Sequence, residues 1–585
     1  IACSWRRGRR VPRVELPRTW ELPRTWPAGR VCGERFGLLN VRQHKARNGL
    51  VMGDIANDPM SAVRSLETDL GGDEDAQEPP TPQAHGLREA YIASVAFAGC
   101  QMAWAVQIGY TSPTFRKLGM PNKTLSYAWL AGPVTGIVVQ PLVGTYSDAC
   151  TSRMGRRRPF IVVGGFFAVL GLVGFSNAQA IGEALGDTDA SHSAGLAFAV
   201  LFFWVLDAAV NVAQGPQRAL MADIVESEQH AQGNAFFAFH NGVGKFLGYG
   251  LGSVCLASAG AVFSWFGTEL RLLYTIAAVV IVVTVSITCV ETHETRWQPS
   301  PGVAGRPPLW TLDGLRESWE DLSSTVRRVP TPVVRAFVVQ FWAYFAWFTI
   351  FVYGSNWVGE EIYQGDPGEE EGDTCGTETD FLKGVQRANL GYLIMAALSS
   401  VWSLVLPSLC RRLGTRAVWA AHLLLMALLL LLTPAVRAGQ KNAATAVLAL
   451  LGFPLAATYQ IPWSILTATT SRELHQDEKA WLSTVFNLAQ CFPEIIVSVI
   501  GGPIVHAFGD VSAALALGGF GALAGMLCCV RVVEPDELFK SASAGPDVSG
   551  MPRYVDGASA PESSSQDAST GGPTGQSVNG GGRGA

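Results

Sequence analysis

Four polar side chains recur at helical spacing inside an apolar stretch that reads FWVLDAAVNVAQGPQRAL over 203–220. They are Asp207, Asn211, Gln214 and Arg218. At about 100° and 1.5 Å per residue they fall on one stripe roughly 16 Å long. Ionisable groups inside a membrane are costly, so we interpret the stripe as facing an internal cavity, where Asp207 could take up a proton. The alternative is a structural Asp–Arg arrangement that fixes helix packing.

A second polar stripe occupies the stretch 480–509, in which Glu494 is the only formal charge. Its members are Asn487, Gln490, Glu494 and Ser498. Binding of substrate and structural pairing are both open interpretations of Glu494. Lys245 is a further cation in an apolar stretch, where it could pair with an acid, act directly or extend to the membrane surface.

Amide side chains add hydrogen-bonding capacity to another apolar stretch. Gln101 and Gln107 flank Trp104 at helical spacing. Sugar hydroxyls need donors and acceptors, and apolar sugar faces stack on aromatic rings. This combination favours a sugar site.

The elements that carry these residues are long enough to cross a membrane, which takes about 20 apolar residues. Twelve such runs occur, at 90–115, 125–147, 159–182, 193–217, 231–258, 272–290, 336–359, 388–410, 417–436, 442–471, 480–509 and 511–530. The polar segment 291–334 divides them six and six. We therefore predict an all-α integral membrane protein with a six-helix bundle at 87–290 and another at 335–531.

The loop charges predict an orientation. Basic loops follow the second and eighth runs, whereas acidic loops follow the third and seventh. Because positive loops stay cytoplasmic, we expect the basic loops, the central loop and both termini in the cytoplasm. The plasma membrane is the expected location, with the vacuolar or another internal membrane as the alternative.

A basic loop after the second run is the candidate gate. It places Asp148 before four arginines, namely Arg153, Arg156, Arg157 and Arg158. We interpret these charges as locking helices in one conformation and releasing them in another. The motif SRMGRR at 152–157 returns as RRLGTR at 411–416, which indicates a two-fold internal repeat with a substrate site between the halves.

Composition excludes several other functions. Only 16% of residues are charged and the net charge is −5, so a nucleic-acid partner is not expected. The 11 cysteines include no CxxC and no Cys/His cluster, which argues against a disulfide framework and a metal site. We find no nucleophile–base pair and no phosphate loop, so we predict neither an enzyme nor a bound cofactor.

The polar ends are expected to be disordered and cytoplasmic, at 1–86 and 532–585. The hexapeptide ELPRTW occurs twice in tandem at 15–26. We interpret 1–51 as a gene-model artefact with Met52 or Met60 as the start, or alternatively as a targeting extension.

Several blocks resemble one transporter family. The segment GTYSDACTSRMGRRRPF resembles the signature of the major facilitator superfamily, and SDACTSRMGRRRPFI resembles the narrower group of plant sucrose–proton symporters with their animal and fungal relatives. Residues 128–148, 202–224, 233–253 and 451–466 resemble further blocks of that group in order. The resemblance spans about 87–531. It implies a role in proton coupling for Asp207 and in substrate transport for Arg218.

The chain departs from that group at charged positions. In the seventh run, Asn356 stands where the group has an acid and Glu360 where it has an arginine, while Glu361 matches. Glu494 stands in place of a glutamine and Lys245 in place of an asparagine. The substitutions at Asn356 and Glu360 motivate an alternative, an uncoupled facilitator or a carrier of another sugar.

We predict proton-coupled symport of sucrose or a related disaccharide or glycoside by alternating access. Asp207 is the expected proton site, and the expected sugar ligands are Arg218, Asn211, Gln214, Gln101, Gln107 and Glu494. The partners are the sugar, protons and the lipid bilayer, and a monomer suffices. The alternatives are an uncoupled facilitator, a carrier of another sugar and a sugar sensor without transport.

Overall fold

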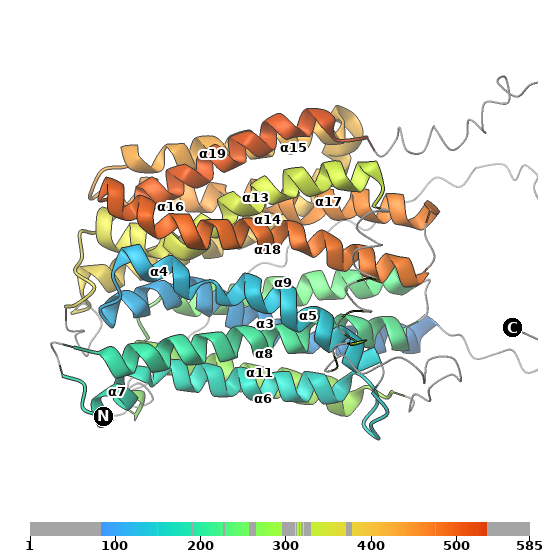
Figure 1. The fold of residues 1–585 in the computed structure, drawn as a ribbon, viewed down its shortest axis with the longest axis horizontal. Coiled ribbons are helices and arrows are strands. Elements are labelled where there is room, and N and C mark those ends of the chain that lie inside the picture. The colour runs from blue at the N-terminus through green and yellow to red at the C-terminus, as the bar shows by residue number, and fades with distance from the viewer. Residues whose placement is uncertain are drawn as a thin grey trace, which may run out of the picture. The chain divides into compact units, whose positions relative to one another are not determined.

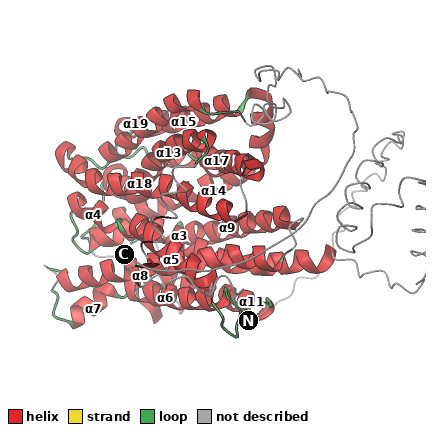
Figure 2. Ribbon diagram, turned by 45° about the vertical axis from the view of Figure 1, so that its right-hand side comes forward, coloured by secondary structure: helices red, strands yellow, loops and turns green. Residues whose placement is uncertain are grey.

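The computed structural model of the protein describes residues 83–534, with side chains from residue 86. Its gaps are 149, 189–190, 226–228, 257–264, 295–310, 312, 315, 317–319, 321–328, 370–376 and 474–475, and the side chains of 230–231, 467–468 and 470–486 are also outside the description. Most of the predicted disordered ends and most of the central loop lie outside the described residues, but 83–86 are helical and 532–534 are described, so the predicted disorder is wrong at these two edges. Within the described part, the regular elements are all helices (Figure 2).

The first half of the described chain forms the lower group of helices in Figure 1. Its elements are α3 (Gln83–Lys117), α4 (Asn122–Ala128), α5 (Ala131–Asp148), α6 (Arg158–Ser176), α7 (Ala178–Ala184), α8 (Ser193–Ile224), α9 (His230–Gly252) and α11 (Glu269–Glu291).

The second half forms the upper group. Its elements are α13 (Thr331–Asn356), the π-helix η3 (Trp357–Ile362), α14 (Asp380–Leu413), α15 (Thr415–Leu431), η4 (Thr433–Ala435), α16 (Lys441–Leu450), α17 (Gly452–Glu473), α18 (Gln476–Phe508), α19 (Ser512–Cys528) and η5 (Cys529–Arg531).

Each predicted run coincides with a long helix or with two short helices in series. Eleven of these segments in the described chain are long and apolar enough to cross a membrane. The twelfth, α9, has 23 residues and packs against α3 and α14. Its glycines and polar residues, including His240 and Lys245, lower its hydrophobicity. The prediction of an all-α membrane fold is confirmed, whereas the twelfth membrane span and the boundaries of the two six-helix halves stay predictions.

Small residues let the helices of the first half approach closely. A Cβ atom on Gly171 of α6 would lie 2.8 Å from the Leu206 backbone of α8, and one on Gly164 would lie equally close to the Ala209 carbonyl oxygen. Lipid tails are as apolar as leucine, so close packing of this kind is what holds membrane helices together. It also fixes the face that α8 turns toward the second half.

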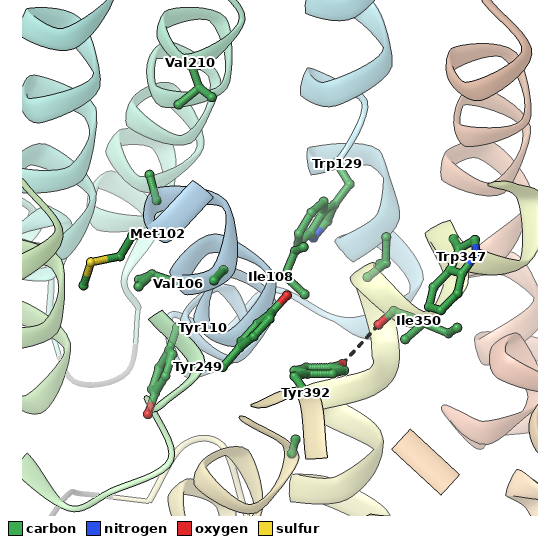
Figure 3. Close-up of a cluster of buried hydrophobic side chains, with 14 of the residues drawn as sticks. Met102, Val106, Ile108, Tyr110, Trp129, Val210, Tyr249, Trp347, Ile350 and Tyr392 are labelled. Carbon is green, nitrogen blue, oxygen red and sulfur yellow. Dashed lines mark hydrogen bonds between the residues drawn. The ribbon is translucent and has the colours of Figure 1, made fainter. Parts of the chain in front are cut away.

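Aromatic side chains fill the contact between the halves. The rings of Tyr249 on α9 and Tyr392 on α14 lie 5.4 Å apart, and Tyr392 Oη donates to the carbonyl oxygen of Ile350 at 3.4 Å (Figure 3). The rings of Trp129 and Phe348, from opposite halves, meet edge to face at 6.1 Å. The two halves therefore share a packed interface.

The two basic loops that form the predicted internal repeat are each followed by a helix whose first N–H groups are capped by a glutamate. The Glu294 carboxylate accepts from the backbone N–H groups of Arg157 and Arg158, each at 3.0 Å, at the start of α6. Glu534 accepts in the same way from Thr415 and Arg416 at 2.7 and 2.9 Å, at the start of α15. A carboxylate satisfies the free N–H groups there and complements the helix dipole.

One covalent link was not anticipated. Cys255 forms a disulfide bond, although the scattered cysteines argue against a disulfide framework. No cluster of three or more metal-ligating side chains occurs in the described part of the chain.

Candidate functional site

Asp207 of α8 lies against α5, where Thr135 and Asn211 surround it with polar groups; we call these three residues the polar bed. Its residue is 2% exposed, and its Oδ2 accepts from the hydroxyl of Thr135 in a very short hydrogen bond. Asn211, one turn further along α8, donates to the same Oδ2 at 3.3 Å and to Thr135 Oγ1 at 2.9 Å. A buried carboxyl without such partners would be strongly destabilising. Sequence reasoning found Asp207 and Asn211 but missed Thr135, which sits in an otherwise ordinary apolar run.

The hydrogen bonds continue from this bed to the second half. Gln140 of α5 donates to Asn211 Oδ1 at 2.6 Å, and Asn487 of α18 donates to Gln140 Oε1 at 3.1 Å. Amides carry both a donor and an acceptor, so they can relay such a chain. The proton-site candidate is therefore connected, through four side chains, to the opposite half.

Glu494 brings a second carboxyl to the same place from α18. Its Oε2 lies 4.0 Å from the position of a Cβ on Gly132 of α5, one turn before Thr135. It also interacts electrostatically with Asp207. Gly132 and Thr135 are three residues apart and share a face of α5, so the two acids approach this face from different halves. The sequence indicated each acid but not their proximity.

The predicted amides retain unused hydrogen-bonding capacity. Gln107 is 1% exposed and adjoins Asp207, yet its amide forms no hydrogen bond of ordinary geometry with the described residues. The same holds for Gln214 Nε2 on α8. Gln101, 8% exposed, lies on α3 where Gly244 of α9 packs. Buried amides without partners suit a ligand that brings its own hydroxyl groups.

Arg218 is separated from Asp207 by 11 positions, which is roughly 16 Å along α8 at the ordinary helical rise. Its guanidinium lies 5.2 Å from the centroid of the Phe97 ring and interacts electrostatically with Tyr344 and Tyr459 of the second half. The structural Asp–Arg pair considered from the sequence does not form. Arg218 is instead exposed, with its guanidinium over the Phe97 ring of α3 in the same half.

Lys245 on α9 meets the second half through an aromatic ring. Its Nζ lies 4.9 Å from the centroid of Tyr459 on α17, and no described carboxylate lies within ion-pair distance. Of the possibilities left open by the sequence, contact with an acid across the halves is therefore not observed. His240, five residues earlier on the same helix, shares a hydrogen bond with Ser94 Oγ at 2.9 Å.

The candidate gate is centred on Arg157. Its guanidinium contacts Asp148 at 2.5 Å, Asp223 at 2.8 Å and Ser147 Oγ at 2.7 Å. Burial alone would lower the pKa of Arg157, but the Asp223 and Asp148 carboxylates outweigh burial and raise it above the ordinary value. Arg156 pairs with Asp223 at 2.5 Å. Asp223, which the sequence did not single out, therefore joins Arg156 to Arg157, and Arg157 in turn contacts Asp148.

The other two arginines act differently. Arg158 donates to the carbonyl oxygens of Cys289 and Thr292 at 3.0 and 2.9 Å, which ties α6 to the end of α11. Arg153 is exposed and forms no ion pair with any residue that the structure describes. Asp223 and Glu294 are the partners that sequence reasoning missed. Their only signal is that each is an acid near the end of a helix, Asp223 in the last turn of α8 and Glu294 just after α11.

At the opposite end, where the acidic loops lie, the halves are joined by polar contacts. Arg116 Nε donates to Glu360 Oε1 at 2.8 Å, and Asn122 Nδ2 donates to Glu360 Oε2 at 3.0 Å. Ser126 Oγ donates to the Ser498 carbonyl oxygen at 2.7 Å. At the basic-loop end, by contrast, nothing described lies within 4 Å of a Cβ on Gly144 or Gly215. We call the end with the acidic loops the acidic-loop end, and the end with the basic loops the basic-loop end. The acidic-loop end is closed.

Comparisons with known proteins agree with this arrangement. A sequence profile described as Major Facilitator Superfamily matches residues 92–491. Sucrose transport protein SUC4 of Arabidopsis thaliana is 33% identical over 455 residues, covering 73% of this chain and 86% of the relative. Sucrose transport protein SUT3 of Oryza sativa subsp. japonica is 28% identical over 485 residues, covering 76% of this chain and 92% of the relative.

Solved structures share the fold. A crystal structure of a D-xylose-proton symporter aligns with a TM-score of 0.54 at 15% identity, covering 76% of this chain and 98% of that chain. The nucleoside transporter NupG aligns with a TM-score of 0.52 at 12% identity, covering 76% of this chain and 99% of that chain. At these identities the likeness concerns the fold alone.

Proposed function

This chain belongs to the major facilitator superfamily, and we propose that it transports sucrose or a related disaccharide or glycoside together with protons by alternating access. Membership makes it a multi-pass membrane transporter and not an enzyme. The relatives named sucrose transport proteins support the choice of sugar.

The observation that carries the proposal is the hydrogen-bonded chain from Asp207 to Asn487. One end of this chain is the buried carboxyl of Asp207, which can gain a proton. The other end is Asn487, which belongs to the second half. Any change in the charge of Asp207 alters which atoms of Thr135 and Asn211 donate and accept. Protonation can therefore influence how tightly the two halves hold together.

The transport cycle then has three steps for these residues. Asp207 takes a proton while the site opens at the acidic-loop end, and sugar hydroxyls bind the amides of Gln107, Gln101 and Gln214. The halves rock about the site, which closes the acidic-loop end through Arg116 and Glu360. Sugar and proton leave at the basic-loop end, where rearrangement of the Arg157 cluster accompanies opening.

The described conformation fits one stage of this cycle. We place the basic-loop end in the cytoplasm because positive loops are retained there. The closed acidic-loop end then makes this an inward-facing state. We propose the plasma membrane as the location, with an internal membrane such as the vacuolar one as the alternative.

An uncoupled facilitator is the second candidate, because the seventh membrane segment carries Asn356 in place of an acid. Asn356 is fully buried, and both of its amide atoms lack a partner among the described residues. Glu361, the one matching acid, accepts from the Ser512 backbone at 3.0 Å instead of facing Asp207. A carrier with fewer titratable groups in its core has fewer ways to couple to protons.

The test is uptake of labelled sucrose into liposomes that contain the full-length protein, with an imposed inward proton gradient. Accumulation that collapses on adding a protonophore supports symport. Equilibration that ignores the protonophore supports the facilitator. Absence of flux in vesicles that still bind sucrose would contradict both and favour a sensor.

A further inference from the structure

Glu494 directs its carboxyl at the contact between the two halves. Its Oε2 lies 4.0 Å from the position of a Cβ on Gly132 of α5, and one turn earlier Cys491 Sγ lies 3.0 Å from that of a Cβ on Gly136. The opposite side of α18, about 140° to 200° away at the ordinary helical turn, carries the exposed apolar residues Phe492, Ile496 and Val499. Glu494 therefore faces the first half, and the apolar side of α18 faces lipid.

Asp207 reaches the same turn of α5 from α8. Thr135, whose hydroxyl donates to Asp207 Oδ2, has its Oγ1 3.1 Å from the carbonyl oxygen of Gly132. Both carboxyls are thus one contact away from the turn 132–135. A helical turn rises about 5 Å, so two negative charges placed on it act on each other. Glu494 and Asp207 do interact electrostatically.

No ion pair in the described part of the chain balances these two acids, and Glu494 forms no hydrogen bond there either. Besides Asp207, the titratable groups that interact with Glu494 are Tyr344 of α13 and Cys491 of α18 itself. A phenol and a thiol carry no positive charge. A proton can therefore relieve the repulsion between the two carboxylates.

The surroundings of the two acids complement each other. Hydrogen bonds donated by Thr135 and Asn211 stabilise the negative charge of Asp207, whereas a second carboxylate on the same turn of α5 favours uptake of a proton by the pair. Asp207 is 2% exposed, but Glu494 is only half-buried and lacks a hydrogen-bond partner among the described residues. Glu494 is therefore the more accessible acid.

The positions of the acids agree with a pair. The resembling symporters have an acid at the position of Asn356 and a glutamine at the position of Glu494. This chain has the reverse, so the number of acids at these two positions is unchanged, while the acid now lies beside Asp207.

We propose that Asp207 and Glu494, one from each half, form a single pair that binds the coupled proton. This inference rests on the proposed function, and it moves Glu494 from the sugar ligands to the proton site. The empty pair has two negative charges that repel across the halves. The loaded pair has one, because a proton enters from the acidic-loop side and later leaves at the basic-loop side. Proton binding thereby favours the approach of the halves and is coupled to their rocking.

The first test measures sucrose accumulation in liposomes that contain the full-length protein, with no membrane potential. With one proton per sugar, an inward gradient of about one pH unit sustains about tenfold accumulation. We expect this ratio to fall to about one in Glu494→Gln and to stay near the wild-type value in Glu494→Asp. Glu291→Gln, on an exposed acid outside the site, is the matched control.

Exchange of labelled for unlabelled sucrose distinguishes a proton site from a sugar ligand. Exchange needs no net proton movement, so Glu494→Gln should retain it with an unchanged KM. Full accumulation in Glu494→Gln would overturn the pair. Exchange that weakens through a raised KM would also overturn it, because that result marks Glu494 as a sugar ligand.

Infrared difference spectra of the purified full-length protein need no transport. The pH is raised from about 6 to about 9, a range in which a carboxyl in water is already ionised. The wild type should lose a protonated-carboxyl band, and Asp207→Asn and Glu494→Gln should each lack that band, because neither acid holds the proton alone. A band that persists in either variant would overturn the pair.

The two measurements separate this inference from the proposed function. Proton-driven accumulation that Glu494→Gln leaves intact would remove only the pair. An infrared band that requires both acids, in a protein that transports no sucrose or equilibrates it regardless of a protonophore, would remove only the proposed sucrose–proton symport.

Discussion

Arg116 and Glu360 form an ion pair at 2.8 Å that joins the two halves at the acidic-loop end. The side chains are 20% and 16% exposed, and Asn122 donates to the same carboxylate at 3.0 Å. Glu360 stands where the resembling sucrose–proton symporters have an arginine, so this chain has gained an acid that contacts a cation of the other half. The pair must break whenever the acidic-loop end opens.

Replacing Glu360 by Gln should favour the state that is open at the acidic-loop end. A partly buried, bidentate contact contributes about 1–2 kcal/mol, which changes a two-state population by roughly tenfold. We expect Cys491, now 5% exposed beside α5, to react faster with an impermeant thiol reagent added from that end. The rate is read by mass spectrometry of the Cys491 peptide.

The control for this prediction is Glu291→Gln. Glu291 also pairs with an arginine, Arg88, at 3.0 Å, but within one half and with far more exposed side chains. Equal labelling rates in Glu360→Gln and in the wild type would show that the ion pair does not hold this end closed.

The positions of the helices were predictable, but the contacts between them were not. Each membrane segment must be long and apolar by itself, so its location is encoded locally. The stripe of Asp207 and Asn211 follows from helical periodicity for the same reason. Thr135 and Asn487 lie 72 and 280 residues from Asp207, and only the packing of α5 between α8 and α18 brings them together.

Only half of the ion-pair cluster around Arg157 was predictable, for a related reason. The arginines stand out because they cluster in one loop. Their partners Asp223 and Glu294 are single acids at the ends of other helices, where a solvated charge is the ordinary interpretation. Glu360 was recognised as a departure from the family, but its partner Arg116 is 244 residues away.

Asp207→Asn should abolish accumulation of sucrose against its gradient while allowing exchange of labelled for unlabelled sugar. An amide cannot bind and release a proton in the working pH range, yet it retains a similar shape and hydrogen-bonding groups. Efflux of sugar preloaded in liposomes, with unlabelled sugar outside, measures exchange. Asp366→Asn, on an exposed loop residue, is the matched control. Normal uphill uptake in Asp207→Asn would refute the assignment of the proton site.

Arg157→Gln should be far more damaging than Arg153→Gln. The Arg157 side chain is 7% exposed and contacts two aspartates, so its loss leaves Asp223 with Arg156 alone. Breaking a buried ion pair costs about 3 kcal/mol, although the exposed Asp148 contributes little to that sum. The melting temperature in detergent and the transport rate should both fall. Arg153 is exposed and unpaired among the described residues, so its variant should resemble the wild type.

The repeated caps predict parallel effects in the two halves. Glu294→Ala and Glu534→Ala each remove a carboxylate from two backbone N–H groups at a helix start, which should cost about 1–2 kcal/mol. Both variants should melt at lower temperature, whereas Glu291→Ala, on an exposed pair, should not. A loss confined to one half would show that the two caps are not equivalent in energy.

Gly155 separates backbone strain from crowding at the first of these caps. It has φ +98°, and a Cβ there would overlap the side chain of Glu294. Gly439 has φ +79° and no described atom within 4 Å, so it experiences the strain alone. Left-handed backbone costs an alanine about 1–2 kcal/mol at either position. Gly155→Ala should therefore lower the melting temperature more than Gly439→Ala. Because the added loss comes from displacing Glu294, including its Cβ atom, it should largely disappear in a Glu294→Gly background, and full additivity of the two changes would contradict this account.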